Sequence, residues 1–175
     1  MILGMSVATF TLLHVLVSLI AIAIGGVVVI EMLRSRLLSG LTALFLATTV
    51  LTSASGFLFH SKSFGAPHVV GLLSLAVLAV ALLALYARHL AGNWRAVYVV
   101  GALIALYLNV FVGVVQAFQK IAFLRALAPS QTEPPFLVAQ ALVLILFIWL
   151  GVAATKRFHP GVAAGPNISM PVGVR

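Results

Sequence analysis

The chain of 175 residues contains no cysteine and no aspartate, and its only carboxylate side chains are those of Glu31 and Glu133. The lack of cysteine excludes disulfides, thiolate catalysis and cysteine-ligated metal or iron–sulfur centres. The lack of aspartate excludes a Ser-His-Asp triad, and two glutamates on opposite sides of the predicted bundle exclude paired-carboxylate chemistry. These absences disfavour an enzyme and leave no catalytic residue to assign.

Charged residues are also scarce. They make up 7% of the chain, whereas 63% of the residues are hydrophobic, a balance that a soluble domain of this size does not tolerate on its surface. A helix needs about 20 apolar residues to cross a ~30 Å hydrocarbon core. The sequence therefore predicts an all-α, polytopic integral membrane bundle over residues 1–158, with the lipid bilayer as its first partner and residues 159–175 as a flexible tail. The predicted spans are residues 5–31, 39–60, 67–88, 96–119 and 135–155.

The ten lysines and arginines give a formal net charge of +8. They are spread over the span ends, the loops and the tail and form no basic run interleaved with aromatics, so they do not indicate a nucleic-acid partner. With five spans, alternate loops lie on opposite sides of the membrane, and seven of the ten basic residues fall on one side. The other side receives three, which are Lys62, Lys120 and Arg125. The positive-inside rule then predicts an outside N-terminus and a cytoplasmic C-terminus in a bacterial-type cytoplasmic (inner) membrane.

Polar and small side chains recur within three spans at separations that share one helix face. The three stripes are Thr11, His14, Ser18, Ala21 and Gly25 in the first span, Thr49, Ser53, Gly56 and His60 in the second, and Asn109, Gly113, Gln116 and Lys120 in the fourth. We expect each stripe to face the bundle interior, because lipid-facing surfaces do not carry such side chains. Helix packing explains the Ser, Thr and Gly members. For His14, Asn109 and Gln116, packing and function both remain open.

Most of the polar residues gather in the outer half of the predicted bundle. His60 ends the second span and His68 begins the third on the outer side, and His14 lies ~13 Å below the same surface at 1.5 Å per residue. Gln116 and Lys120 close the fourth span there. The sequence therefore predicts a polar cavity that opens toward the outer leaflet. Its lining is predicted to be His14, His60, His68, Asn109, Gln116 and Lys120.

Two kinds of ligand suit that cavity. His14, His60 and His68 lie on different helices, so two of them could supply the axial imidazoles of a haem b, and the three together could bind copper. Alternatively, a quinone, a lipid or another amphipath enters between the helices, and its polar head is held by His14, Asn109, Gln116 and Lys120. Several phenylalanines in the same half, Phe57 and Phe59 among them, would provide an apolar pocket for a ring-shaped ligand.

The preferred hypothesis is a non-catalytic, redox-associated membrane protein that binds haem or quinone. The runner-up is a scaffold or assembly subunit whose polar stripes receive a helix from another membrane subunit or from a second copy of the chain. Lipid or small-molecule binding or transport is a further alternative. Proton-coupled transport is disfavoured, because neither glutamate lies at the bilayer centre.

Two segments resemble known families. His14-Val15-Leu16 followed by Gly25-Gly26 resembles the histidine-bearing first helix of small bacterial inner-membrane proteins, including the membrane domain of copper-resistance proteins. Gly56-Phe57-Leu58-Phe59-His60, with His68, Gly71 and His89, is similar to the histidine-marked helix pairs of b-type cytochrome-like and cytochrome-oxidase assembly membrane proteins. The resemblance implies haem, copper or quinone association at His14, His60 and His68. The chain departs from it in lacking a mid-helix histidine pair at cytochrome-like spacing.

Overall fold

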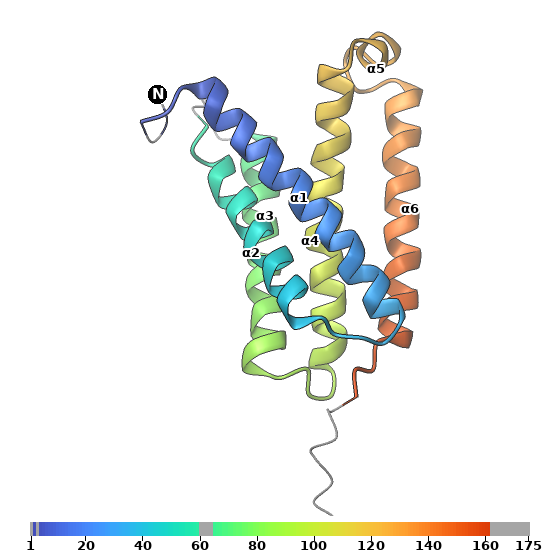
Figure 1. Ribbon diagram of the computed structural model, residues 1–175. Coiled ribbons are helices and arrows are strands. Elements are labelled where there is room, and N and C mark those ends of the chain that lie inside the picture. The colour runs from blue at the N-terminus through green and yellow to red at the C-terminus, as the bar shows by residue number, and fades with distance from the viewer. Residues whose placement is uncertain (1, 3, 60–64, 162–175) are drawn as a thin grey trace, which may run out of the picture.

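The computed structural model describes residue 2 and residues 4–59 and 65–161. Five helices within these residues are long and apolar enough to cross a membrane (Figure 1). They are α1 (Val7–Leu33), α2 (Ser39–Gly56), α3 (Ala66–Leu82) with its π-helical continuation η1 (Leu83–Ala87), α4 (Trp94–Lys120) and α6 (Pro134–Arg157). The prediction of a helical bundle with five candidate membrane spans is thereby confirmed. Residues 162–175 of the predicted tail lie outside the described residues.

The helix ends follow local chemistry. Ser6 precedes α1, and its Oγ accepts a 3.1 Å hydrogen bond from the backbone N–H of Thr9, an N-terminal cap. Pro134 and Pro135 occupy the first turn of α6, where a missing N–H costs no intrahelical bond. A short helix, α5 (Ala122–Leu127), lies between α4 and α6. It was not predicted from the sequence.

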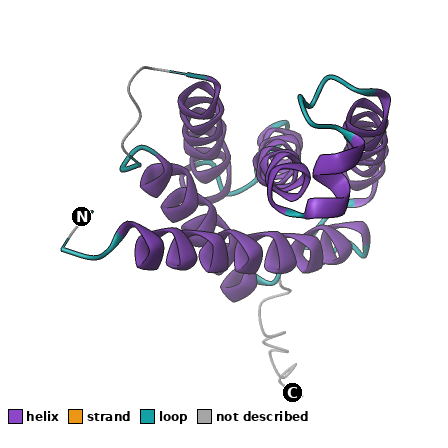
Figure 2. Cartoon of the chain, turned by 90° about the horizontal axis from the view of Figure 1, so that it is seen from above, coloured by secondary structure: helices purple, strands orange, loops and turns teal. Residues whose placement is uncertain are grey.

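The helix α4 is the centre of the bundle. Helices α1, α2, α3 and α6 all contact it, and α1 runs obliquely across α2, α4 and α6 (Figures 1 and 2). Successive spans run in opposite directions, so every second connection lies at the same end of the bundle. The basic residues are concentrated at one of the two ends. One end, called the basic end here, carries Arg34, Arg36, Arg88, Arg95, Lys156 and Arg157. The opposite end carries α5 with Lys120 and Arg125 and is called the α5 end.

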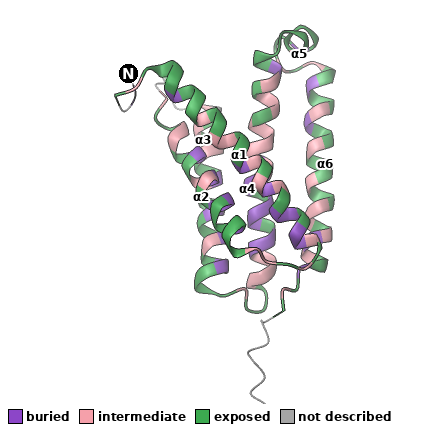
Figure 3. Ribbon diagram, in the orientation of Figure 1, coloured by how far each residue is buried: buried purple, intermediate pink, exposed green. Residues whose placement is uncertain are grey.

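Most of the core lies toward the basic end (Figure 3). Met32, Phe45, Tyr98 and Phe158 are among the largest side chains that are fully buried there. The rings of Tyr98 and Phe158 lie 6.0 Å apart, so the residue that follows α6 packs against the first turns of α4. This end of the bundle is therefore closed by side chains from the start of α4 and from the residue that follows α6.

Two glycines allow the helices to approach closely. A Cβ at Gly25 of α1 would lie 2.6 Å from Cδ1 of Leu106 and 2.8 Å from Cε2 of Phe45, so α1 meets both α4 and α2 at this residue. A Cβ at Gly101 of α4 would lie 3.1 Å from Cβ of Ala81 on α3. Small residues at such crossings increase the van der Waals contact that drives helix association in a membrane.

An ion-pair cluster holds the turn between α1 and α2. Glu31 is buried in the last turns of α1, and its carboxylate contacts Nη1 of Arg34 at 2.8 Å and Nε of Arg36 at 3.3 Å. Both arginines are exposed. A buried carboxylate needs such partners, because an isolated charge would be costly there.

Candidate functional site

His14 lies in the first half of α1 and faces α2. Its Nδ1 is 2.8 Å from Oγ of Ser55, a residue 41 positions away in the sequence, near the end of α2. The ring of Phe59 meets the imidazole edge to face, with a centroid separation of 5.1 Å and an interplanar angle of 87°. Phe10, one turn before His14, packs on the same phenylalanine at 5.1 Å. The imidazole is thus half-buried, with one nitrogen bonded and an aromatic pair beside it.

The hydrogen bonds of Ser55 determine which nitrogen of His14 carries the proton. The Oγ of Ser55 donates a 3.1 Å bond to the backbone carbonyl of Thr52. A serine hydroxyl has one hydrogen, so both bonds form together only when Nδ1 of His14 donates and the serine oxygen accepts. In the neutral ring this leaves Nε2 as an unprotonated acceptor or metal ligand. No hydrogen bond to Nε2 occurs among the residues that the structure describes.

Further polar groups lie along the same part of α2. Ser53 donates a buried 2.9 Å hydrogen bond to Oγ of Ser74 on α3. Two buried atoms, Oγ1 of Thr52 and Nδ2 of Asn109 on α4, find no hydrogen-bond partner within the described segments. An unsatisfied buried polar group costs about 1–3 kcal/mol, so these two atoms are candidates for contact with a ligand.

The other predicted histidines are placed differently. His68 lies in the first turn of α3, and its Nδ1 accepts a 3.2 Å hydrogen bond from the backbone N–H of Gly65, which caps the helix. Its ring also packs against that of Phe57, 5.8 Å away. His60 lies outside the described residues. Because Nδ1 of His68 accepts, the neutral ring carries its hydrogen on Nε2, the reverse of the arrangement at His14.

Only some members of the three predicted stripes are buried in the bundle interior. Ala21, Gly25, Thr49 and Ser53 are buried as expected. The expectation is wrong for four members, which are exposed: Thr11, Gly113, Gln116 and Lys120. Within the described chain no hydrogen bond joins His14 to Asn109, Gln116 or Lys120. The cause is the oblique path of α1, whose first half packs chiefly on α2 and exposes apolar side chains such as Leu12 and Leu16 on its other sides (Figure 1).

Polar residues near α5 connect helices. Gln131, in the segment before α6, donates from Nε2 to the carbonyl of Val115 at 3.0 Å, and its Oε1 accepts from Gln119 at 3.4 Å. On α6, Gln140 donates from Nε2 to the carbonyl of Phe111 at 3.2 Å. These amides hold the α4–α5–α6 segment together, which is the packing interpretation of polar residues in membrane helices.

Ser55, Thr52 and Ser74 were not among the site residues predicted from the sequence. Ser55 falls outside the stripe drawn through Ser53, and α3 shows no polar stripe that would single out Ser74. Their pairing with His14 and Ser53 depends on where α1, α2 and α3 cross. The only available signal was the high density of hydroxyl residues in the stretch 48–55.

Comparisons of the chain with protein-family models, with curated proteins and with solved structures find no match. A search of the described residues for three clustered His, Cys, Asp or Glu side chains, the usual set for a metal ion, also finds none. A function for the chain is therefore inferred from its own residues.

Proposed function

We propose that this protein is a redox-associated, non-catalytic membrane protein that binds the head group of a quinone beside His14, in a bacterial-type cytoplasmic membrane with its basic end inside. The observation that carries the proposal is the hydrogen-bond chain from His14 through Ser55 to the carbonyl of Thr52. It orients the imidazole and leaves Nε2 as an acceptor inside an apolar helix pair. A quinol hydroxyl is the kind of donor that such an acceptor binds.

The surroundings of His14 suit a flat, apolar ring with polar edges. Phe59 and Phe10 provide aromatic surface, and aromatic rings pair favourably edge to face. The Oγ1 of Thr52 is buried three residues before Ser55 and has no hydrogen-bond partner among the described residues, so it would donate to a quinone oxygen. A quinone reaches such a site from the bilayer, where its isoprenoid tail already resides, so the site needs no opening to water.

Haem is the second ligand to consider, because Nε2 of His14 is also suited to iron, with Ser55 as the outer partner that fixes the ring. A bis-histidine haem needs a second imidazole with an unprotonated Nε2. The Nδ1 of His68 accepts a hydrogen bond from the Gly65 N–H, so its neutral ring carries a hydrogen at Nε2 instead of a free lone pair. His60, the other candidate for a second imidazole, lies outside the described residues. A quinone requires only the single acceptor of His14, whereas a bis-histidine haem or a copper ion needs further ligands that do not cluster with it among the described residues. Quinone is therefore preferred.

The test is to extract the detergent-purified protein with organic solvent and quantify quinone by chromatography. Short-chain ubiquinone is then titrated into the stripped protein. We expect the His14→Leu variant to lose both the co-purified quinone and the titration. His89→Asn is the matched control, because His89 is exposed and has a left-handed backbone with φ +49° that asparagine tolerates.

Equal quinone binding by the two variants would overturn the site. The absorption spectrum, taken oxidised and then reduced with dithionite, separates haem from quinone. A Soret band that disappears in His14→Leu would replace quinone by haem as the ligand of the same residue.

A scaffold or assembly role is the second candidate, and the exposure of α6 favours it. This helix buries only Phe136, Gln140 and Ala154 among its residues, and exposes large apolar side chains such as Ile145 and Trp149. Such a surface accommodates a helix of another subunit as well as lipid. Absence of quinone and haem from the native protein, combined with a stable complex that Trp149→Ala weakens, would favour this role.

A further inference from the structure

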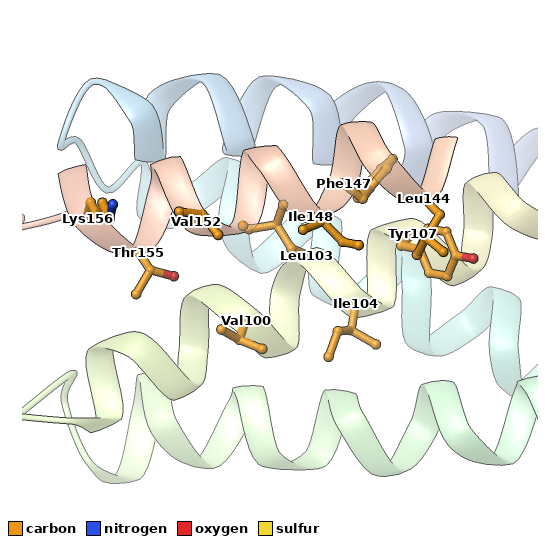
Figure 4. A pocket seen from close by; sticks show the side chains of 11 residues that line it. Val100, Leu103, Ile104, Tyr107, Leu144, Phe147, Ile148, Val152, Thr155 and Lys156 are labelled. Atoms are coloured by element: carbon orange, nitrogen blue, oxygen red, sulfur yellow. The ribbon is translucent and has the colours of Figure 1, made fainter. Parts of the chain in front are cut away.

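Two apolar grooves flank the exposed ridge that Val100 and Ile104 form on α4. One groove, of about 460 Å³, lies between α4 and α6 (Figure 4). The other, of about 520 Å³, lies between α3 and α4. Val100 and Ile104 line both, so the grooves are neighbours that share a wall. They lie on a different face of α4 from Tyr98 and Ala102, which are buried in the core.

The α4–α6 groove has the length of one bilayer leaflet. It follows α6 from Leu144 to Lys156, which is ~18 Å at 1.5 Å per residue. Half of the hydrocarbon core is ~15 Å thick. The second groove follows α4 from Ala96 to Ile104, ~12 Å, and stays within the same leaflet. Both grooves therefore run from the basic end toward the middle of the membrane.

The α4–α6 groove ends at Lys156, a cation that has no acidic partner among the described residues. Lys156 and Thr155 close it at the basic end (Figure 4). The chain has only two acidic side chains. Glu31 is engaged by Arg34 and Arg36, and Glu133 lies at the other end of α6. The counter-ion of Lys156 must therefore come from outside the described residues.

The α3–α4 groove has a basic residue close to its corresponding end. Arg88 follows η1, the continuation of α3, and its guanidinium lies 5.1 Å from the ring centre of Trp94, the first residue of α4. This cation–π pair places a positive charge and an indole at the level where phospholipid head groups lie.

We infer that the two grooves form a binding site for one anionic diacyl phospholipid. One acyl chain lies in each groove on either side of Val100 and Ile104, and the phosphate pairs with Lys156. The two apolar grooves, which stay within one leaflet, accommodate acyl chains, and Lys156 at the end of the α4–α6 groove, without an acidic partner among the described residues, favours a negative head group. This site is separate from the one at His14, and neither inference requires the other.

Native mass spectrometry of the detergent-solubilised protein tests the inference. The protein is mixed with equal amounts of palmitoyl-oleoyl phosphatidylglycerol and palmitoyl-oleoyl phosphatidylcholine, and the bound lipids are counted by mass. We expect one tightly retained phosphatidylglycerol per chain. Lys156→Gln should weaken its retention about fivefold, the factor for losing one cation near an anionic lipid. Lys120→Gln, at the α5 end, should not.

A second pair of variants tests the groove itself. Gly151 lines the α4–α6 groove, and a Cβ there would meet no atom within 4 Å, so Gly151→Phe fills the groove without disturbing the core. Gly26 on α1 is equally unobstructed and lines neither groove, which makes Gly26→Phe its matched control. We expect only Gly151→Phe to lose the retained lipid.

Three results would overturn the inference. They are equal retention of phosphatidylcholine and phosphatidylglycerol, unchanged lipid retention in Gly151→Phe, and a lipid-free dimer that Gly151→Phe dissociates. The last would show that a second copy of the chain occupies this face.

Discussion

The Oγ of Ser35 accepts a 2.8 Å hydrogen bond from the backbone N–H of His159, 124 residues later in the chain. The bond ties the turn between α1 and α2 to the segment that follows α6. It adds to the buried core at the basic end. His14 lies toward the opposite end, where α1 packs chiefly on α2.

The hydroxyl of Ser55 should control the tautomer of His14. In Ser55→Ala the imidazole loses the acceptor that keeps hydrogen on Nδ1, so ¹⁵N NMR of labelled histidine should show a shift toward the Nε2–H form. Quinone affinity should fall about fivefold, the equivalent of one hydrogen bond of about 1 kcal/mol. Ser53→Ala is the control, because Ser53 bonds to Ser74 instead. An unchanged tautomer in Ser55→Ala would contradict the assignment.

Gly25 and Gly26 should respond oppositely to alanine. A Cβ at Gly25 enters the space of Leu106 and of the buried ring of Phe45, whereas one at Gly26 meets nothing within 4 Å. Gly25→Ala should destabilise the protein by about 1–3 kcal/mol, the cost of overpacking. Gly26→Ala should be neutral or stabilising by up to ~1 kcal/mol, since alanine is the better helix former. Unfolding in mixed micelles with increasing SDS measures both; equal stabilities would show that α1 does not cross α2 and α4 at Gly25.

Glu133 should titrate below the usual range of a glutamate. Its pKa is lowered chiefly by the hydrogen bond from the side chain of Ser130, with further bonds from the backbone N–H groups of Ser130 and Thr132. The lowered pKa means that the ordered turn is stabilised above the normal carboxyl range. This stabilisation is lost as pH falls through the lowered value. Carbon-13 NMR with labelled glutamate should resolve the titration, because the chain has only one other glutamate, Glu31.

The control for that titration is Ser130→Ala, which should move the pKa of Glu133 back toward its ordinary value. A Glu133 pKa that is the same in the two proteins would contradict the structure of the turn before α6.

Reporter fusions should place the basic end in the cytoplasm. A green fluorescent protein joined after Arg175 should fluoresce, and alkaline phosphatase joined there should be inactive, because the excess of lysine and arginine at this end favours retention inside. Alkaline phosphatase inserted after Gln131, at the α5 end, should be active. The opposite pattern of activities would reverse the proposed orientation.

The class of fold and much of its organisation could be predicted from the sequence. Long apolar runs must form helices in a membrane, since backbone groups find no other hydrogen-bond partners there. The last span, predicted from residue 135, begins at Pro134. The second helix ends at Gly56, four residues before the predicted boundary at residue 60, and α5 was not expected because six residues carry too little periodicity to reveal a helix.

The sequence by itself also singled out His14, because a lone imidazole inside an apolar run stands apart from its neighbours. Only the tertiary structure decided what His14 contacts and which stripe members are buried. Helical periodicity defines a face but not the neighbour that covers it. The crossing of α1 at Gly25 brings His14 to Ser55, whereas Gln116 and Lys120, on the expected face of α4, stay exposed. Such pairings depend on crossing angles, which arise from the packing of all the helices together.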